Sequence, residues 1–380
     1  MRTFEEHLAA VRDTVGARET VSLPLLDAAA LHAPVAEDVV ARFDSPRFDN
    51  SQMDGYALPH SEGGTFQVGP TIAAGSDTAA IYPDGIGESA APIMTGAPLP
   101  AGASCVVPVE KCSPAQFAAE GEEITAPACA PGQFIRRAGS DARRGERLIP
   151  RGTPVDPLVV ATLASQDVDS VRVERPSRIL VVTGGKEIGT HIPDANGPML
   201  KALARRYGIE VAGTLRTDDD PAALEKSLTH AIAQHAPDAV VTSGGISHGK
   251  FEVVRQILEP HGWFGHVAQQ PGGPQGLATF HGVPFLCLPG NPISTLVSFR
   301  LYAAPALGCA PRPLRTRLAS PAAALPDKDR FYRGVFRDDA AVIGGAGSHL
   351  ISQAVGANCL IRVPAGVGAD EGADVVVYPL

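Results

Sequence analysis

The sequence lacks the features of several large protein classes. It has no run of 18 apolar residues, and its net charge of −9 leaves no surplus of Lys and Arg. We therefore expect neither a membrane span nor a nucleic-acid partner, since a bilayer core needs a long apolar helix and phosphate backbones attract basic surfaces. The first residues, MRTFEEHLAAV, lack the apolar core of a secretion signal. These absences predict a cytoplasmic protein.

The chain also has few cysteines, and no two of them form the CxxC pair that is typical of zinc sites. Cys287 and Cys359 fall in apolar, strand-like runs. The other four are Cys105, Cys112, Cys129 and Cys309. The sequence predicts that the thiols are buried and reduced, as is usual in a cytosolic protein.

What is present is typical of a folded, multidomain protein. The chain has 380 residues, of which 44% are hydrophobic and 19% are charged. At roughly 100–200 residues per domain, this length predicts two to four domains. The 40 glycines and 34 prolines are spread along the chain, which predicts many turns rather than a low-complexity segment.

The N-terminal part combines short helices with an all-β stretch. Residues 3–17 carry apolar side chains at helical spacing, and Thr3 and Glu6 form a capping-box pattern at the start. Residues 41–140 show short apolar runs between Gly, Pro, Asp and Ser turns, a pattern of strands without a long helix. Further expected elements are short helices over 25–31 and 157–165 and strands over 146–149 and 170–173.

From residue 178 to 308 strands alternate with helices. The expected strands cover 179–183, 210–215, 239–242 and 283–288, and the expected helices cover 198–207, 221–234, 251–258 and a segment that begins at Pro292 after the N-cap Asn291. This alternation predicts a parallel sheet covered by helices. Residues 315–380 return to short strands with glycine turns, which predicts a small β domain.

Glycines follow three of these strands, as Gly184-Gly185, Gly244-Gly245 and Gly290. In an open parallel sheet such turns meet at one edge, where glycine lets the backbone approach a phosphate and the next helix offers free N–H groups. The turns predict a site for a phosphate-bearing ligand, although ordinary strand–helix turns also use glycine. Residues 244–250 match GxxxxGK, but Phe251 replaces the Ser or Thr of a P-loop, and no GxGxxG follows a strand.

Acidic residues follow the same turns. Glu187 comes after the first turn and Glu252 after the second, and Asp194 and Asn196 precede a helix. A carboxylate beside a phosphate is favourable only with a bridging cation, and Mg²⁺ prefers one or two carboxylates plus phosphate oxygens. Glu187 and Glu252 are therefore candidate Mg²⁺ ligands. An acid placed at a helix start by the helix dipole would equally explain Glu252.

Three polar segments stand out in the all-β stretch, namely FDNSQMDGYA (48–57), IMTGAP (93–98) and RRAGSD (136–141). They supply hydroxyl, guanidinium and carboxylate groups, which suit anion binding and proton transfer. A set of Asx turns, or a solvated edge strand for the two arginines, would explain the same residues without a function.

These segments occur together in one known family. In order, FDNSQMDGYA (48–57), IMTGAPLP (93–100), RRAGSD (136–141), TSGGISHGK (242–250), LPGNPIST (288–295) and GSHLISQAVGANCLI (347–361) resemble motifs of the molybdopterin molybdenumtransferases. This is the MoeA family, which includes the gephyrin E domain. The resemblance runs over essentially the whole chain.

The resemblance implies a multidomain fold of α/β and β parts. A three-layer α/β domain like that of molybdopterin adenylyltransferases, with a parallel-rich sheet, would combine residues 1–21 and 175–312. The other parts would be a connecting domain over 22–40 and 142–174, a β-rich domain over 41–141 and a C-terminal β-barrel-like domain over 313–380. Family members form homodimers, with active sites between the β-rich domain of one subunit and the adenylyltransferase-like domain of the other.

The implied reaction inserts molybdenum from the substrate molybdate into adenylylated molybdopterin and releases AMP, with Mg²⁺ or Zn²⁺. By position in the motifs, the catalytic residues would be Asp54, Thr95 and Asp141, with the two carboxylates as acid–base or molybdate-side groups. Glu187 and Glu252 would hold the metal. The substrate-binding residues would be Ser51, Arg136, Arg137, Gly184, Gly244, Gly245, Ser247, Pro289, Gly290, Asn291, Pro292 and Ser294.

Some positions depart from the family pattern. Many relatives carry Lys where this chain has Gln270 and Gly273, and Asp where it has Glu252. Two contacts to an anion, each contributing about 1.5–3 kcal/mol, would be lost unless His248 or Lys250 replaces them. Two alternatives therefore stay open: the protein carries molybdopterin species without inserting the metal, or it prefers tungstate.

Overall fold

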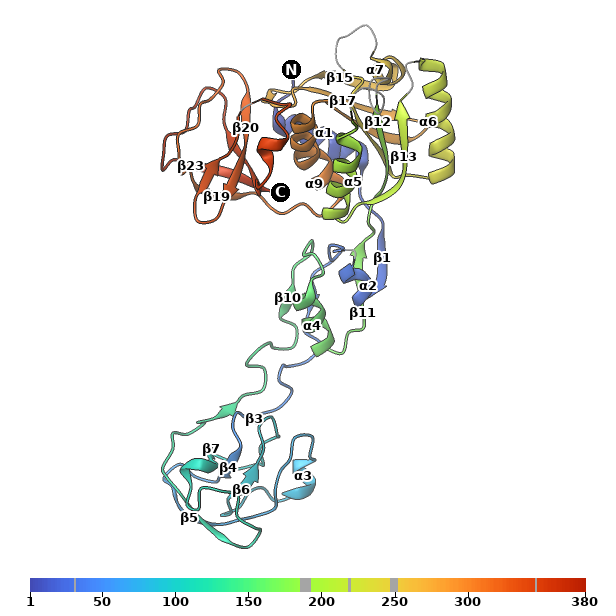
Figure 1. Cartoon of the computed structure of the whole chain (residues 1–380). Helices are drawn as coiled ribbons and strands as arrows, with labels where there is room; N and C mark the ends of the chain where they lie inside the picture. Colours follow the sequence, from blue (N-terminus) through green and yellow to red (C-terminus); the bar gives the residue numbers. More distant parts are fainter. Residues whose placement is uncertain (31, 185–192, 218–219, 247–251, 346) are drawn as a thin grey trace. The chain divides into compact units, whose positions relative to one another are not determined.

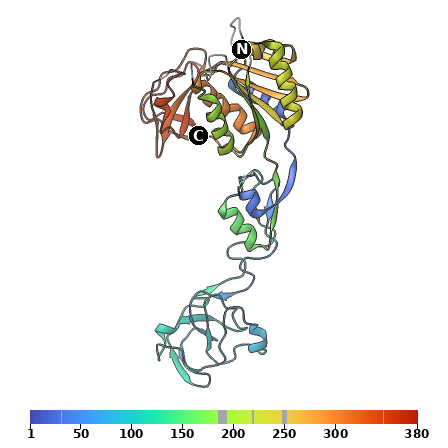
Figure 2. The ribbon, with the colours of Figure 1, turned by 45° about the vertical axis from the view of Figure 1, so that its right-hand side comes forward.

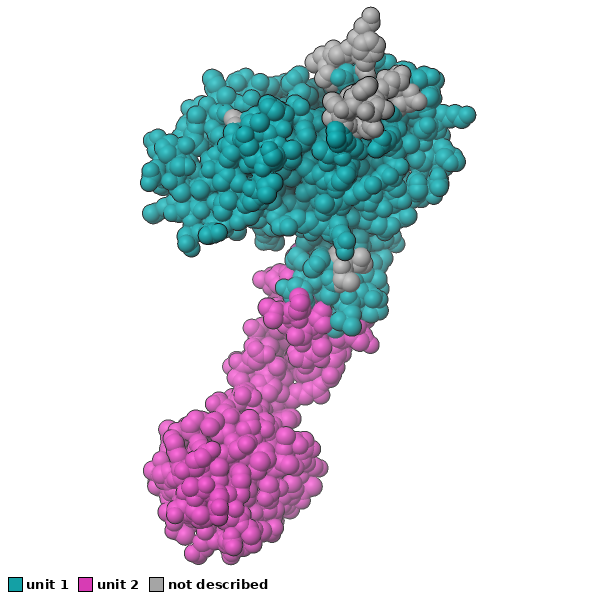
Figure 3. Space-filling view, in the orientation of Figure 1, with its two compact units in different colours: residues 1–36, 154–156, 171–380 teal, residues 37–153, 157–170 magenta. Residues whose placement is uncertain are grey.

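The computed structural model describes residues 1–380 except 31, 185–192, 218–219, 247–251 and 346. The chain divides into two compact units (Figure 3). Unit 1 comprises residues 1–36, 154–156 and 171–380, and unit 2 comprises residues 37–153 and 157–170. Among the described residues, no helix is long and apolar enough to cross a membrane. The finer division into four domains stays a prediction.

Unit 1 is built around a six-stranded sheet in the order β13-β12-β14-β18-β17-β15. The first four strands run parallel, as expected, because the chain returns through a helix between β12, β13 and β14. Their bounds are β12 Arg178–Gly184, β13 Glu210–Thr217, β14 Ala239–Ser243 and β18 Val283–Leu288.

Two strands at one edge make the sheet parallel-rich rather than wholly parallel. The strands β15 (Gly262–His266) and β17 (Pro274–Phe280), which the sequence did not indicate, run antiparallel. β17 turns directly into β18 through His281 and Gly282, whose φ values are 50° and 76°. Two successive residues with positive φ form the tight turn that matches strand twist, and histidine is an uncommon residue there.

Helices cover both faces of the sheet (Figures 1 and 2). Alternate residues of β12 separate the two apolar layers, since Ile179 and Val181 pack on one side and Leu180 and Val182 on the other. The helices on the first side are α1 (Phe4–Val15), α5 (Asn196–Arg206), α8 (Pro292–Ser298), the π-helical turn η3 (Phe299–Ala303) and α9 (Ala304–Leu307). The helices on the second side are α6 (Pro221–His235) and α7 (Val253–Leu258). The short 3₁₀ turn η2 (Glu259–His261) follows α7 in the chain.

The expected capping box at the start of α1 is confirmed. The Thr3 hydroxyl accepts the Glu6 N–H at 3.1 Å, and the Glu6 carboxylate accepts the Thr3 N–H at 2.8 Å. These two bonds satisfy donors that a helix start leaves free. Phe4 and Val11 then pack into the core beside η3 and α9.

Two further sheets complete unit 1. The C-terminal sheet has the order β16-β20-β22-β23-β19, and β21 pairs with the last residues of β20, Gly334 to Phe336. Its closure as a barrel stays a prediction. The other sheet pairs β1 with β11. The bounds are β1 Thr20–Pro24, α2 Leu25–Ala30, β11 Ser170–Glu174, β16 Gln269–Gln270, β19 Leu314–Arg317, β20 Asp329–Phe336, β21 Ala340–Val342, η4 Ser352–Ala354, β22 Cys359–Val363 and β23 Asp374–Pro379.

Unit 2 consists mostly of short strands, as the sequence predicts. Its sheets are β6-β4-β7, β5-β8, β3-β9 and β10-β2. Tyr56 and Leu58 of β4 pack into one apolar cluster and Ala57 into another. The bounds are β2 Val39–Val40, β3 Asn50–Ser51, β4 Gly55–Leu58, β5 Gly64–Gln67, α3 Thr78–Ile81, β6 Ala91–Ile93, β7 Cys105–Pro108, η1 Val109–Lys111, β8 Glu123–Ala126, β9 Ile135–Arg136, β10 Arg147–Ile149 and α4 Pro157–Ser165.

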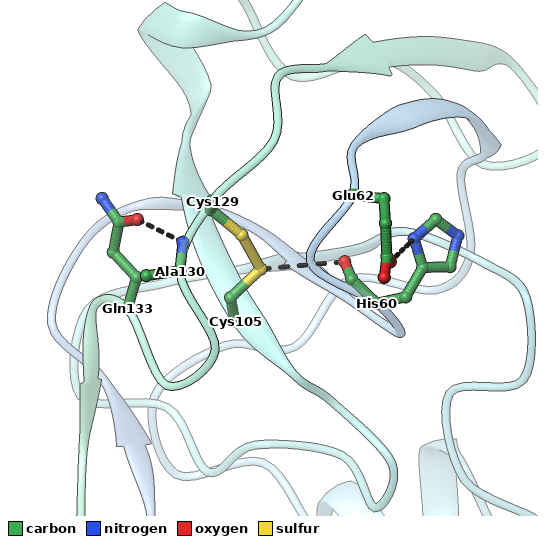
Figure 4. The surroundings of a disulfide bond; sticks show 6 residues. All are labelled: His60, Glu62, Cys105, Cys129, Ala130 and Gln133. Atoms are coloured by element: carbon green, nitrogen blue, oxygen red, sulfur yellow. Dashed lines mark hydrogen bonds and ion pairs between the residues drawn. A yellow bond between two sulfur atoms is a disulfide. The ribbon is translucent and has the colours of Figure 1, made fainter.

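The prediction of reduced thiols is wrong for one pair. Cys105, at the start of β7, forms a disulfide with Cys129, which follows β8 (Figure 4). Cys112, Cys287 and Cys359 are free and buried, as expected, and Cys309 is free and half-buried. Spacing alone could not reveal the pair, because the fold brings the two cysteines together. Disulfides are rare in the cytosol, so this pair does not favour the cytoplasmic location, which stays a prediction.

Candidate functional site

The three glycine turns of unit 1 lie against one another. Gly184 ends β12, Gly244 follows β14 and Gly290 follows β18, and these strands are adjacent and parallel. A Cβ atom placed on Gly290 would lie 3.2 Å from the Gly244 Cα, and one on Gly244 would lie 3.5 Å from the Gly184 carbonyl oxygen. The turns therefore form one continuous patch of bare backbone at the carboxyl edge of the sheet, where open α/β sheets bind ligands.

Backbone geometry explains why glycine occupies the middle turn. Gly244 has a φ of 93° and Gly245 a φ of 73°, a region that residues with a side chain rarely adopt. A Cβ on Gly245 would also lie 2.8 Å from the Val254 side chain of α7. Both glycines are thus needed for the turn itself.

A hydrogen-bond network behind the glycines holds the strand ends in place. The Asn196 amide donates to the Ser243 hydroxyl at 3.0 Å and to the Gly290 carbonyl oxygen at 2.7 Å. Ser243 also bonds the Thr295 hydroxyl at 2.9 Å, which donates to the Pro289 carbonyl oxygen at 2.6 Å. The sequence did not single out Ser243 or Thr295. Their signal was a polar side chain at a buried strand end or on the buried face of a helix.

The turn after β18 leads into α8 as predicted. Asn291 is the N-cap and Pro292 the first helical residue, although the Asn291 side chain makes no capping bond. The Ile293 N–H donates to the Ser348 carbonyl oxygen at 3.0 Å. The 347–361 motif therefore contacts the 288–295 motif. Ser294 is buried within α8, so its role as a phosphate-binding hydroxyl stays a prediction.

Of the two candidate metal ligands, one can be placed. Glu252 is the N-cap residue of α7, and the N–H of Arg255 in this helix donates to the Gly245 carbonyl oxygen at 3.0 Å. Glu187 and Ser247 lie outside the described residues, as do His248 and Lys250. Within the described part of the chain, no three His, Cys, Asp or Glu side chains form a group that could hold a metal ion.

In unit 2, Asp54 and Thr95 lie together at one end of the β6-β4-β7 sheet. Asp54 precedes β4 and Thr95 follows β6, and Gly55 pairs with Ile93 in the antiparallel register. The Asp54 carboxylate accepts the Thr95 backbone N–H at 2.6 Å and the Thr95 hydroxyl at 2.7 Å. These two bonds hold the pKa of Asp54 below its ordinary value, and the bond from the backbone N–H contributes more than the bond from the hydroxyl. The exposed carboxylate is therefore ionised near neutral pH.

The 136–141 motif contacts the 48–57 segment, which contains Asp54. Arg137 pairs with Asp49 at 2.5 Å, and Asp49 also accepts the Ala138 N–H at 2.8 Å. The Ala138 N–H contributes most to lowering the pKa of Asp49, and Arg137 adds to it. One step along the strand, Arg136 donates to the Asn50 side chain at 3.2 Å. Pairing of β3 with β9 thus joins the two segments through side chains as well as backbone.

Two further candidate site residues in these two segments, Asp141 and Ser51, differ in exposure. Asp141 is exposed, and its carboxylate accepts the Ser45 hydroxyl at 3.2 Å. Ser51 is fully buried, and its hydroxyl donates to the Met53 carbonyl oxygen at 2.6 Å. The structure therefore gives Ser51 a part in shaping the loop, and its predicted contact with substrate stays untested.

Three family models match the sequence in chain order. The MoeA N-terminal region (domain I and II) matches residues 2–166, a probable molybdopterin binding domain matches residues 180–308, and the MoeA C-terminal region (domain IV) matches residues 315–380. Together the matched segments leave only short gaps.

Curated relatives match along most of the chain. Molybdopterin molybdenumtransferase 2 of Mycobacterium tuberculosis is 33% identical over 96% of this chain and 96% of its own. Molybdopterin molybdenumtransferase of Haemophilus influenzae is 29% identical over 86% of this chain and 85% of its own.

Solved structures share the fold. The molybdopterin biosynthesis MoeA protein from Pyrococcus horikoshii OT3 superimposes with a TM-score of 0.79 at 23% identity, over the full length of both chains. A second structure of a MoeA protein from the same genus gives a TM-score of 0.73 at 25% identity, over 99% of this chain and 98% of that chain. The expected multidomain fold of mixed sheets and helices is thereby confirmed.

Proposed function

Because the chain belongs to the MoeA family of molybdopterin molybdenumtransferases, we propose that it inserts molybdenum from molybdate into adenylylated molybdopterin and releases AMP, within molybdenum cofactor biosynthesis. The meeting of the Gly184, Gly244 and Gly290 turns carries this proposal. An adenylylated molybdopterin contains a pyrophosphate linkage, and bare backbone at a strand–helix edge suits close contact with phosphate oxygens.

Asp54 supplies the second part of the proposal. Its carboxylate is ionised near neutral pH because Thr95 lowers its pKa, so it accepts protons more readily than it donates them. When two dithiolene thiols bind molybdate and displace one oxo group, their two protons leave with that oxygen as water. An ionised Asp54 would take each thiol proton and pass it to the departing oxygen. Arg136 and Arg137 would reduce the repulsion between the anionic reactants.

The described residues fit Mg²⁺ bound mainly through the substrate. Mg²⁺ is commonly held by one or two carboxylates plus phosphate oxygens rather than by a protein cage, and the carboxylate of Glu252 is a donor of this kind. Glu252, beside the Gly245 turn, would hold the ion, together with Glu187. When bound, Mg²⁺ would neutralise phosphate charge during cleavage of the adenylate.

The direct test is incubation of the full chain with adenylylated molybdopterin, molybdate and Mg²⁺, followed by measurement of AMP and of molybdenum cofactor. We expect AMP release that is stoichiometric with metal insertion. AMP release without molybdate, or no AMP release under any condition, would contradict the insertion reaction. Replacing molybdate by tungstate in a parallel series compares the two oxyanions, and faster turnover with tungstate would support the tungstate alternative.

A molybdopterin carrier is the second candidate, and Gln270 and Gly273 favour it. Gln270 is exposed on β16, and Gly273 follows in the same loop. Neither residue supplies a cation. A cationic residue does lie next to Gln270, because Gln270 pairs with Arg330 of β20. A carrier would retain adenylylated molybdopterin intact in the incubation above. Restoring the charges as Gln270→Lys with Gly273→Lys should then raise AMP release only if the missing cations limit the reaction.

The homodimer with active sites shared between subunits is also part of this proposal. Mixing Asp54→Asn protein with Gly290→Val protein tests whether sites are shared. The first variant inactivates the Asp54 part of a site, and the second inactivates the glycine-turn part. If a site combines residues of two subunits, random reassortment restores about one quarter of wild-type activity. If each site lies within one subunit, or if the protein is a monomer, the mixture stays as inactive as the separate variants.

A further inference from the structure

The Cys105–Cys129 disulfide of unit 2 has no part in the proposed reaction, yet its two sulfurs differ in access. Cys105 is fully buried at the start of β7, in the apolar cluster that contains Tyr56. Cys129 lies half-buried in the loop after β8 (Figure 4). A thiol can exchange with a disulfide only where it reaches one of the two sulfurs. Cys129 therefore offers the more accessible side of this bond.

The bond attaches the loop that follows Cys129 to the start of β7. The Gly132 N–H donates to the carbonyl oxygen of Ser104, the residue before Cys105, at 2.7 Å. The Cys129 N–H donates to the Ser61 carbonyl oxygen at 2.9 Å. The disulfide is the covalent part of this attachment, so its cleavage would leave hydrogen bonds to hold the loop.

The same loop supports Arg137. A Cβ atom on Gly132 would lie 3.3 Å from Nη2 of Arg137, so the guanidinium lies against the loop. The guanidinium also pairs with Asp49. Arg136, the preceding residue of β9, donates to the Asn50 side chain at 3.2 Å. The position of both arginines beside the 48–57 segment thus depends on the stretch of chain that the disulfide anchors.

Phe134 gives this loop a reason to relax. Its φ is 55°, a region that residues with a side chain rarely adopt. Such a conformation persists only when the surrounding contacts impose it. One of these contacts reaches the Asp54 segment directly, because the Phe134 carbonyl oxygen accepts the Gln52 N–H at 2.9 Å. A weaker attachment of the loop would therefore be felt at the candidate site.

We propose that the Cys105–Cys129 bond is a site of thiol–disulfide exchange with a dithiol reductant, and that its state sets the position of Arg136 and Arg137. In the oxidised protein the anchored loop holds both arginines beside the 48–57 segment. In the reduced protein the loop relaxes, and the arginines bind an anionic substrate less tightly. The effect on substrate rests on the proposed function, whereas the exchange itself does not.

The exchange conserves atoms and electrons. A thiolate of the reductant attacks the Cys129 sulfur, forms a mixed disulfide and displaces Cys105 as a thiolate, which takes up the proton that the attacking thiol gave up. The second thiol of the reductant then attacks its own sulfur in the mixed disulfide and releases Cys129 as a thiol. The protein gains two electrons and two protons, and the reductant loses them as it forms its own disulfide.

A neighbouring thiol does not compete for the bond. Cys112 lies in the same apolar cluster as Cys105. Burial, with a smaller contribution from Glu110, raises the pKa of the Cys112 thiol to about 11. Since the thiolate and not the thiol attacks a disulfide, Cys112 stays inert near neutral pH. Exchange is therefore directed to Cys129 from the solvent.

The test compares the oxidised and reduced full chain in buffers of oxidised and reduced dithiothreitol. Alkylation with mass spectrometry should show that the bond opens reversibly, with unchanged circular dichroism. Hydrogen exchange of residues 129–137 should be at least about tenfold faster in the reduced protein. The double variant Cys105→Ser with Cys129→Ser should exchange fast in both buffers, whereas Cys309→Ser, at a free thiol of unit 1, should respond like the wild type.

Calorimetry with adenylylated molybdopterin, without molybdate, measures the effect on the arginines. Reduction should raise the Kd about tenfold, the effect of losing one charge-assisted contact. Arg137→Gln should raise the Kd in the oxidised protein by a similar factor and leave little further response to reduction. Arg147→Gln, which removes another arginine–aspartate pair of unit 2, should keep the full response.

Three results overturn the inference: a bond that excess dithiothreitol does not open in the folded protein, unchanged hydrogen exchange of residues 129–137 after reduction, or an unchanged Kd in a reduced protein that binds the substrate. AMP release is scored separately. If the oxidised protein neither binds adenylylated molybdopterin nor releases AMP, the proposed function fails, and faster exchange on reduction still establishes the exchange site.

Discussion

The glycine turns of unit 1 and the Asp54 loop of unit 2, the two parts of the proposed site, are built in opposite ways. Unit 1 uses backbone: Gly184, Gly244 and Gly290 meet at the edge of a parallel sheet, with polar side chains such as Asn196 behind them. Unit 2 uses side chains: Asp54 is fixed by Thr95 and Asp49 by Arg137, at the end of short antiparallel strands. A backbone site is sensitive to added volume, whereas a side-chain site is sensitive to lost charge.

The cores differ in the same sense. The α/β part of unit 1 buries one sheet between two layers of helices. Unit 2 divides its apolar residues into two smaller clusters around β4 and adds the Cys105–Cys129 disulfide. Small cores often need such a covalent link. Substitutions in the two units should therefore have different effects. We expect those in unit 2 to change the rate of reaction or the free energy of unfolding, and those at the glycines of unit 1 to change ligand affinity.

The largest effect is expected for Asp54→Asn. The substitution keeps the size and removes the charge, so AMP release should fall by about 10²–10⁴-fold while the fold is retained, since this is the usual contribution of a proton-transfer group. Rates of AMP release and circular dichroism check the two parts. Asp38→Asn is the control, because a backbone N–H, that of Arg151, likewise lowers the pKa of Asp38. A normal rate in the Asp54 variant would remove it from the chemistry.

Loss of the disulfide should affect unit 2 alone. Replacing Cys105 and Cys129 by Ser opens a loop with a sequence separation of 24 and should lower the free energy of unfolding of this unit by about 3 kcal/mol. Chemical denaturation with proteolysis as the probe separates the two units. Cys309→Ser, at a free thiol of unit 1, should leave unit 2 unchanged. If the double variant unfolds like the wild type, the bond does not stabilise the protein in solution.

Gly244→Ala should have a smaller effect on stability, but it should also weaken the binding of AMP. A methyl group at a φ of 93° costs about 1–2 kcal/mol, and here it would also face the Gly184 carbonyl oxygen at 3.5 Å. Gly282→Ala is a matched control, with a φ of 76° and no atom within 4 Å of the new Cβ. Both variants should lose stability in denaturant titrations, and only Gly244→Ala should bind AMP more weakly. Equal AMP affinities would mean that the turn does not contact the nucleotide.

The smallest expected effect is a displaced pH profile in Thr95→Val. The hydroxyl bond is lost and the backbone bond remains, so the pKa of Asp54 rises toward its ordinary value. A reaction that needs the ionised carboxylate is lost as the pH falls through that pKa, so the acidic limb of kcat/KM should move to higher pH. Thr65→Val, at a hydroxyl that bonds the Thr125 hydroxyl, should not move it. An unmoved limb in Thr95→Val would assign that limb to another group.

Local patterns predicted much of the fold because they record local interactions. The capping box of Thr3 and Glu6 gave the start of α1, and the predicted helix 157–165 has the bounds of α4. The alternation from residue 178 indicated the parallel strands and their helices. The sequence did not indicate the antiparallel strands β15 and β17, because their residues GWFGH and PQGLATF contain glycine and a His–Gly turn is an uncommon hairpin signal.

The sequence by itself determined the family and the chemical groups of the candidate site, because motifs such as FDNSQMDGYA and LPGNPIST are contiguous in the chain. Only the tertiary structure decided which groups meet. It joins Asp49 to Arg137 across 88 residues, seats Gly244 against Gly290 and pairs Cys105 with Cys129. These contacts depend on strand register and helix packing, which sum many weak interactions over the whole chain and leave no signal at any single residue.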